Sequence, residues 1–133
     1  MSHTIIEPPG WPKPKGYSNG MLAARGRTLF MAGQVGWDEH ERFPSPDLVP
    51  QFEQALRNLL AIVRAAGGEP AHICRMTCFC KDREQYLATR HQLRGVWKEL
   101  MGDHYPCMSM IFVVDLLDHP AVIEIEATAV IPD

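Results

Sequence analysis

The sequence of 133 residues has no long hydrophobic run and no excess of positive charge. Its uncharged apolar stretches, such as Met108–Val114, have the length of a strand and are far too short to cross a bilayer. Lys and Arg total 13 against 16 Asp and Glu, which argues against nucleic-acid binding because that function normally shows a clustered basic excess. Gly-x-Gly-x-x-Gly and P-loop motifs are also missing, so a nucleotide cofactor has no support.

The sequence has little that would direct the chain out of the cytosol. Residues 1–16 lack the apolar core of a signal peptide. Four cysteines fit a reducing cytosol better than a disulfide framework. We therefore expect a cytoplasmic protein made of one domain, residues 1–133, since a chain of this size buries enough surface to fold without staples.

Hydrophobic periodicity predicts two helices and five strands. The chain is expected to begin with a hairpin of strands 20–25 and 28–34, which turns at Arg25-Gly26-Arg27. A helix follows from an N-cap at Asp47 to a stop at Gly67-Gly68, and then a buried strand over 72–81. A second helix begins at a capping box of Asp82 with Gln85 and ends at Gly102, and strands over 106–114 and 122–131 complete the pattern. This β-β-α-β-α-β-β order predicts an α+β sandwich of two layers. The helices would cover one sheet face, and an uncovered face usually means a partner subunit.

The cysteines are the obvious candidates for a metal site. On a strand, Cys74, Cys78 and Cys80 would share one face. Same-face neighbours lie about 7 Å apart, whereas zinc sites usually take paired thiolates from a C-x-x-C turn. We therefore expect these cysteines to pack in the core and expect no metal. Cys107 after Pro106 is also expected to be structural, and the absence of a completed Pro-Cys-x-x-Cys motif excludes a zinc deaminase.

Two glutamates and one arginine each allow two interpretations. Glu124 and Glu126 would share one face of the last strand. They are either the polar face of an ordinary strand or carboxylates for general acid–base catalysis on a sheet face covered by a neighbour. Arg90 lies on the apolar stripe of the second helix. It either lays its stem along the core with its head in water or binds a ligand carboxylate through its two-pronged guanidinium.

Several motifs resemble the reactive intermediate deaminase (Rid) family, also called the YjgF family. The likeness runs through nearly the whole chain in the family's order. The stretches that carry it are Gly16-Tyr17-Ser18-Asn19-Gly20, Leu29-Phe-Met-Ala-Gly-Gln34, Ala65-Ala-Gly67, Thr77-Cys-Phe-Cys-Lys-Asp82, Tyr105-Pro106 and Ile123-Glu-Ile-Glu-Ala-Thr-Ala-Val130.

The resemblance implies a chorismate-mutase-like fold, a six-stranded mixed sheet with two helices on one face. It also implies a homotrimer whose sheets form a central barrel and whose three ligand pockets lie between subunits. Archetypal members hydrolyse reactive enamines and imines to 2-keto acids and ammonia, with no metal or organic cofactor. An endoribonuclease name is also attached to the family, but the acidic balance of this chain gives that activity little support.

Carried over by position, the resemblance implies a set of site residues. Tyr17 would line the pocket, backbone groups around Gly33 would contact the ligand, and Glu124 would position or activate the water. In archetypal members an arginine that holds the substrate carboxylate lies two residues after the proline of the Tyr/Phe-Pro motif. Here that position is Met108, and Met110 follows it in the pocket wall. A thioether cannot replace a bidentate contact to a carboxylate.

Arg90 falls where archetypal members have a pocket asparagine. We hypothesise that Arg90 supplies the missing cation from another wall of the cleft, so that the preferred ligand has a different shape. Two functions then remain open. The first is an imine or enamine deaminase with altered substrate preference; the second is a trimer that binds small carboxylates without catalysis.

Overall fold

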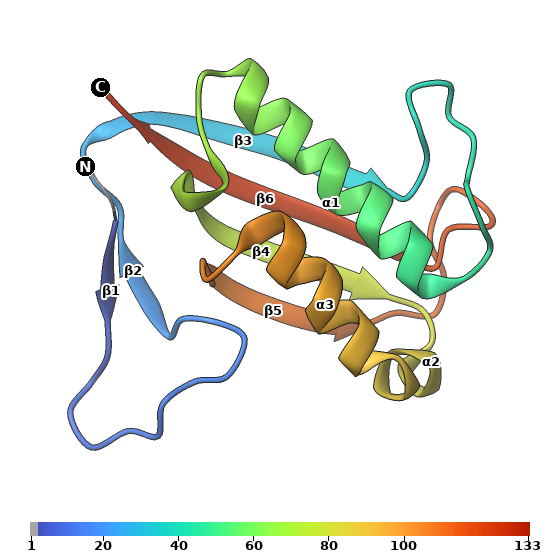
Figure 1. The fold of residues 1–133 in the computed structure, drawn as a ribbon, viewed down its shortest axis with the longest axis horizontal. Helices are drawn as coiled ribbons and strands as arrows, with labels where there is room; N and C mark the ends of the chain where they lie inside the picture. Colours follow the sequence, from blue (N-terminus) through green and yellow to red (C-terminus); the bar gives the residue numbers. More distant parts are fainter. Residues whose placement is uncertain (1–2) are drawn as a thin grey trace.

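The structure is a computed structural model that describes residues 3–133. Its elements are β1 (Thr4–Ile6), β2 (Gly20–Leu22), β3 (Gly26–Val35), α1 (Leu48–Ala65), the 3-10 turn η1 (Pro70–His72), β4 (Ile73–Cys80), α2 (Arg83–Ala88), α3 (Arg90–Met101), β5 (Cys107–Phe112) and β6 (Ile123–Pro132). Four strands form a mixed sheet in the order β3-β6-β4-β5, in which β4 and β5 are parallel and the other pairs are antiparallel. Helices α1 and α3 pack side by side on one face of it (Figure 1). The predicted α+β class and its two layers are confirmed.

Helix α1 forms the centre of the core. Phe52, Leu56, Leu59 and Val63, spaced three and four residues apart, are buried against the sheet. The helix begins after Asp47, as predicted, but the Asp47 side chain makes no capping hydrogen bond. The amide of the first helical residue donates instead to Oε1 of Gln85, at 2.6 Å. A residue from a distant helix therefore caps α1.

The predicted N-terminal hairpin is wrong. Strand β2 does not pair with β3; it pairs antiparallel with β1, and the two form a separate two-stranded sheet. The sheet that carries the core therefore has four strands, not the six expected. His3 adds a contact to this pairing: its Nδ1 accepts a hydrogen bond from the amide of Ala24 at 2.9 Å, just after β2. Gly26 is not a turn residue: it begins β3, where a Cβ would lie 2.8 Å from the carbonyl carbon of Ile131.

The predicted second helix is divided in two. Helix α2 ends before Thr89, whose hydroxyl donates to the carbonyl of Gln85 at 2.7 Å, and α3 begins at the next residue. The capping box is half formed. The amide of Gln85 donates to Oδ1 of Asp82 at 3.0 Å, but the Gln85 side chain accepts from the first amide of α1 and not from the Asp82 amide. The three later strands lie where they were expected, within one or two residues.

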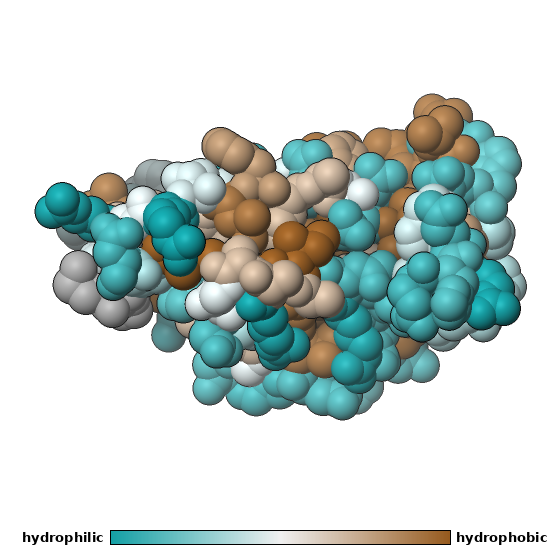
Figure 2. Space-filling view, turned by 90° about the horizontal axis from the view of Figure 1, so that it is seen from above, coloured by the Kyte–Doolittle hydropathy of each residue, from teal (hydrophilic) through white to brown (hydrophobic). Residues whose placement is uncertain are grey.

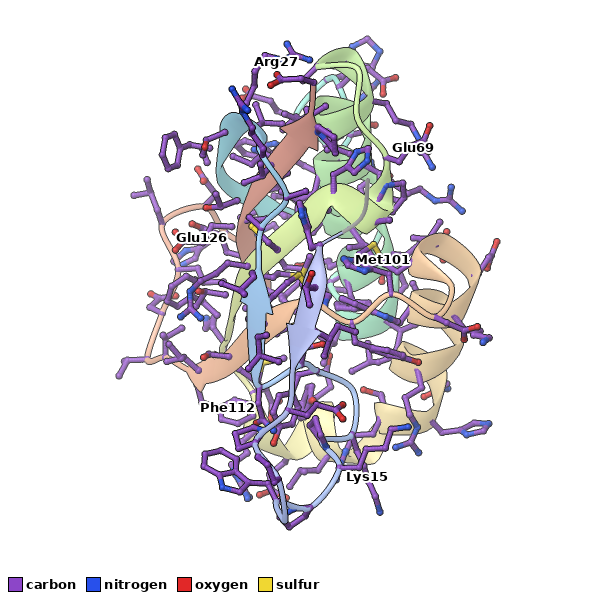
Figure 3. All side chains as sticks on the ribbon, turned by 90° about the vertical axis from the view of Figure 1, so that its left-hand side faces the viewer. Lys15, Arg27, Glu69, Met101, Phe112 and Glu126 are labelled. Carbon is purple, nitrogen blue, oxygen red and sulfur yellow. The ribbon has the colours of Figure 1, made fainter. Side chains whose placement is uncertain are left out.

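The sheet face opposite the helices is not covered by any helix of residues 3–133. In Figure 3, Glu126 lies on that side of the sheet and Met101 on the helix side. Phe30 of the edge strand β3 is 80% exposed. Seen from above, the side on which Figure 1 draws β3, apolar residues gather in the middle of the molecule (Figure 2). An exposed apolar patch of this kind marks an interaction surface. None of the helices of residues 3–133 is long and apolar enough to cross a membrane.

Candidate functional site

A cavity of about 500 Å³ lies on the helix side of the sheet, beside the edge strand β5. It is enclosed by α1, α2, α3, the strands β4 and β5, and the loop between β1 and β2. Its lining residues are Lys15, Gly16, Tyr17, Phe52, Cys78, Tyr86, Arg90, Leu93, Arg94, Trp97, Tyr105, Met108 and Met110. Four of the six residues predicted for the site, namely Tyr17, Arg90, Met108 and Met110, therefore lie around one cavity.

Strand alternation and helix periodicity bring these residues together. Met108 and Met110 are two apart on β5, so both side chains face the helices. Sδ of Met108 lies 4.0 Å from Sγ of Cys78 on the neighbouring strand. On α3, Arg90 and Arg94 are four residues apart and share the face that lines the cavity.

The N-terminal loop is fixed over the cavity by Ser18. Its amide donates to the carbonyl of Pro106 at 3.2 Å, and its hydroxyl donates to the carbonyl of Tyr105 at 2.5 Å. These two hydrogen bonds hold Lys15 and Tyr17 at the mouth, where Tyr17 is 42% exposed.

Trp97 forms a rigid part of the wall. Its ring stacks on Tyr105, with the centroids 6.1 Å apart and the planes 10° from parallel. The indole N–H donates to the carbonyl of His104 at 3.1 Å. Because that donor is already used, Trp97 offers a ligand only its apolar ring.

The charge of the lining is positive and is not neutralised. Lys15, Arg90 and Arg94 all line the cavity, and no acidic residue does. Among residues 3–133, no carboxylate lies within 4.0 Å of these three cations. Burial raises the pKa of the Cys78 thiol to about 12, so this residue is neutral. The cavity thus combines an apolar floor with a cationic rim, which suits an anion with an apolar body.

The other two predicted residues, Glu124 and Gly33, lie next to each other on a different surface. Glu124 is opposite Val35 in the β3–β6 ladder and alternates with the buried Ile123 and Ile125. It therefore projects from the face that the helices leave open. A Cβ placed on Gly33 would collide with the Glu124 carboxylate, so the glycine leaves the room that this carboxylate occupies.

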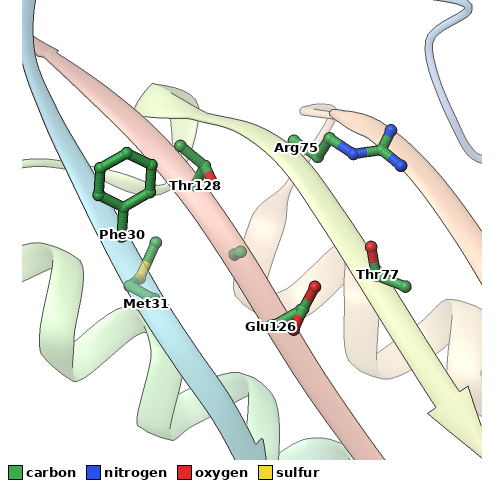
Figure 4. Close-up of a pocket in the computed structure, with 7 residues that line it drawn as sticks. Phe30, Met31, Arg75, Thr77, Glu126 and Thr128 are labelled. Carbon is green, nitrogen blue, oxygen red and sulfur yellow. The ribbon is translucent and has the colours of Figure 1, made fainter.

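The open face also holds a smaller cavity, of about 250 Å³ (Figure 4). The side chains of Thr77 of β4 and Glu126 of β6 project on this side of the sheet, and Phe30 of β3 lies beside Thr128 at its edge. Its lining residues are Phe30, Met31, Arg75, Thr77, Glu126, Ala127 and Thr128. Within one chain, the four-stranded sheet separates this surface from the larger cavity.

The cysteines are divided between core and surface. Cys78 and Cys80 are buried, as expected for core residues, while Cys74 and Cys107 are partly exposed. A bulge in β4 removes Cys74 from the expected alternation, and its thiol donates to the carbonyl of Thr128 at 3.4 Å. Among residues 3–133, no three His, Cys, Asp or Glu side chains are grouped so that they could hold a metal ion.

Sequence reasoning missed Lys15, Arg94, Trp97 and most of the aromatic wall. Arg94 and Trp97 had a signal, because they follow Arg90 at four and seven residues on one helix. Lys15 had a weaker signal, namely its place two residues before Tyr17, in the loop that Ser18 holds over the cavity.

Comparison with known proteins agrees with this architecture. The family model described as endoribonuclease L-PSP matches residues 12–131. A Rid family protein of unknown function from Yersinia pestis has a similar structure, with a TM-score of 0.87, 31% identity, and coverage of 98% of this chain and 100% of that one. This chain belongs to the Rid family.

Two curated relatives extend the comparison. A RutC family protein from Pasteurella multocida is 33% identical over 79% of this chain and 81% of its own length. The human 2-iminobutanoate/2-iminopropanoate deaminase is 26% identical over 86% of this chain and 79% of its own length. The Rid family assigned to this chain therefore includes a relative named as an imine deaminase.

Proposed function

We propose that this Rid protein hydrolyses an imine or enamine of an organic acid to the corresponding keto acid and ammonia, with a substrate preference that differs from that of archetypal members. The observation that carries the proposal is the cavity, in which Arg90 and Tyr17 stand over an apolar floor that includes Met108. Arg90 would bind the substrate carboxylate that the family arginine, absent at position 108, cannot bind. The name of the human relative supports the reaction type.

The proposed site requires more than one copy of the chain. Glu124 and Gly33 project from the open sheet face, and the cavity lies on the opposite side. The open face carries the exposed ring of Phe30, which favours its burial against another subunit. We infer a homotrimer in which the Glu124 carboxylate of one copy meets the cavity of the next.

The proposed chemistry needs one positioned carboxylate and one water. An enamine first becomes an imine by gaining a proton at carbon and losing one from nitrogen. Glu124 then accepts a proton from the water as its oxygen attacks the C=N carbon, and the proton passes to the nitrogen. Transfer of the remaining hydroxyl proton to nitrogen, by way of Glu124, collapses the tetrahedral intermediate to C=O and releases ammonia. Because the substrate is already reactive, positioning together with this proton transfer suffices.

Ammonia release from 2-imino acids generated in the assay tests the proposal. Glu124→Gln keeps the shape of the side chain but removes its basicity, and we expect kcat to fall about 100-fold or more. Glu126→Gln is the matched control, since it lies two residues away on the same face, and should keep kcat within about threefold. Light scattering and thermal melting check that both variants assemble and fold like the parent protein.

Two results would contradict the proposal. If Glu124→Gln kept full activity, the carboxylate would have no catalytic role. If the parent protein released no ammonia from any of the 2-imino acids or enamines tested, the chain would be a carboxylate-binding trimer without this activity.

A further inference from the structure

Arg94, the second arginine of α3, has no role in the function proposed above. We propose that the cavity selects a dianion with an apolar, ring-sized body, in which one carboxylate binds Arg90 and the other binds Arg94 together with Lys15. The inference rests on the proposed function only in taking this cavity as the substrate site. Beyond the proposed function, it specifies that the substrate carries two negative charges and that the rest of the substrate is apolar and about the size of a ring.

The two arginines are spaced for two separate acidic groups. Arg90 and Arg94 are one helical turn apart, which puts their Cβ atoms about 5–6 Å from each other. Each guanidinium presents a planar pair of donors that fits one carboxylate. Lys15 lines the same cavity from the loop between β1 and β2 and adds a third cation.

Repulsion between these cations is not offset by an ion pair with any of residues 3–133. Like charges four residues apart destabilise a helix, and no carboxylate of residues 3–133 lies within 4.0 Å of Arg90 or Arg94. Lys98, one turn further along α3 and outside the cavity, is paired with Asp103. The cations of this helix that line the cavity are thus those without a partner, and a ligand with two negative charges would neutralise them.

The floor of the cavity indicates the rest of the ligand. Phe52, Leu93, Trp97 and Met108 present apolar surface, and the indole N–H is already bonded to a backbone carbonyl. A 2-imino acid with a short alkyl chain would leave much of this surface against water. An aromatic or similarly large apolar body would cover it, and the thioether of Met108 can adapt to the shape of a ring.

Calorimetry with three stable probes tests this inference without any turnover. Phenylsuccinate has two carboxylates and a ring, 3-phenylpropanoate keeps the ring but has one carboxylate, and succinate keeps both carboxylates but has no ring. We expect the parent protein to bind phenylsuccinate about 10-fold or more tightly than 3-phenylpropanoate, because 3-phenylpropanoate lacks one charge-assisted contact. The same margin is expected over succinate, because succinate lacks the ring that would cover the apolar floor. Equal affinity for phenylsuccinate and 3-phenylpropanoate would overturn the inference, and this comparison needs no variant to fold.

Variants then assign the second charge to its residue. Arg94→Gln should weaken phenylsuccinate binding about 10-fold or more and change 3-phenylpropanoate binding less than about threefold. Arg83→Gln is the control, because Arg83 is an exposed arginine of α2 that does not line the cavity. An equal loss in both variants would mean that only overall charge matters, which would contradict the assignment.

The outcome is separable from that of the proposed function. Ammonia release together with no preference for the dianion would refute this inference and leave the deaminase activity standing. Tight, Arg94-dependent binding of phenylsuccinate by a protein that releases no ammonia would support this inference and refute the deaminase activity.

Discussion

Replacing Gln51 by Leu tests whether one buried amide holds together the two loops that lead to the site. Gln51 is fully buried in α1. Its Nε2 donates to the carbonyl of Ser45 at 2.9 Å and to that of Pro120 at 3.0 Å, and its Oε1 accepts from the amide of Val122 at 2.8 Å. Val122 directly precedes β6, so this amide fixes the start of the strand that carries Glu124.

The expected cost follows from those three hydrogen bonds. Leucine has a similar volume and no polar atoms, so Gln51→Leu leaves three backbone groups without their partner. Each hydrogen bond contributes about 1 kcal/mol, and a group that stays buried without a partner costs about 1–3 kcal/mol. Since Ser45 and Val122 are only partly buried and Pro120 is exposed, water recovers some of the loss. We expect the free energy of unfolding to fall by about 2–4 kcal/mol.

Urea unfolding followed by circular dichroism measures this change. Gln92→Leu is the control: it makes the same substitution at an exposed position of α3, where the effect should stay within about 0.5 kcal/mol. A Gln51→Leu protein as stable as the control would refute the reasoning. It would show that the loops hold their conformation without the amide.

Two further predictions concern catalysis and pH. Gly33→Ala should lower kcat for ammonia release about 10- to 100-fold while the protein stays folded, because the added Cβ displaces the Glu124 carboxylate; unchanged kcat would contradict this. Burial lowers the pKa of His104 below its ordinary 6.5, so below pH 6.5 the unfolded chain takes up a proton that the folded chain does not. The free energy of unfolding should therefore decline as the pH falls from 7 to 5, and urea titrations should show a smaller decline for His104→Gln.

The elements with strong periodicity could be predicted from the sequence. Helix α1 and strand β6 carry unbroken apolar patterns that only one secondary structure satisfies. Strand β4 is recognisable instead from its β-branched, aromatic and sulfur-containing residues. The N-terminal hairpin failed for a physical reason. Strand β2 has only three residues, too few for its own pattern to specify a partner, and it pairs with β1 near the chain start. The His3 side chain adds one hydrogen bond beside that pair.

The break between α2 and α3 was also beyond the sequence pattern. The apolar spacing continues across Thr89, and a helix through it keeps the same periodicity. What ends α2 is the Thr89 hydroxyl, which bonds to the carbonyls of Gln85 and Tyr86. Gln85 was expected to complete its own capping box, but its side chain caps α1 instead. Such choices depend on which helix lies within reach, and that is known only once the fold is formed.

The grouping of the site residues was half predictable. Met108 and Met110, and likewise Arg90 and Arg94, share a face by simple periodicity. Neither the strand alternation nor the helical repeat indicates that β5 and α3 line one cavity. They also do not indicate that Glu124 projects from the opposite face of the sheet. That separation follows from the alternation of β6 only after the helices are known to lie on a single side.

The roles proposed for Arg90 and Arg94 would allow an anion to bind without an arginine at residue 108. Met108 is partly buried and lies against the buried thiol of Cys78 on the cavity floor, where a guanidinium would lose part of its hydration. Arg90 and Arg94 stand instead at exposed positions of α3, where they keep water until a ligand replaces it. Moving the charge from the floor to the rim costs less desolvation and leaves the floor free for an apolar body. A ligand would therefore bind with its acidic groups toward the mouth. This orientation follows because Met108 stands where archetypal members have an arginine, while Arg90 and Arg94 lie at the rim.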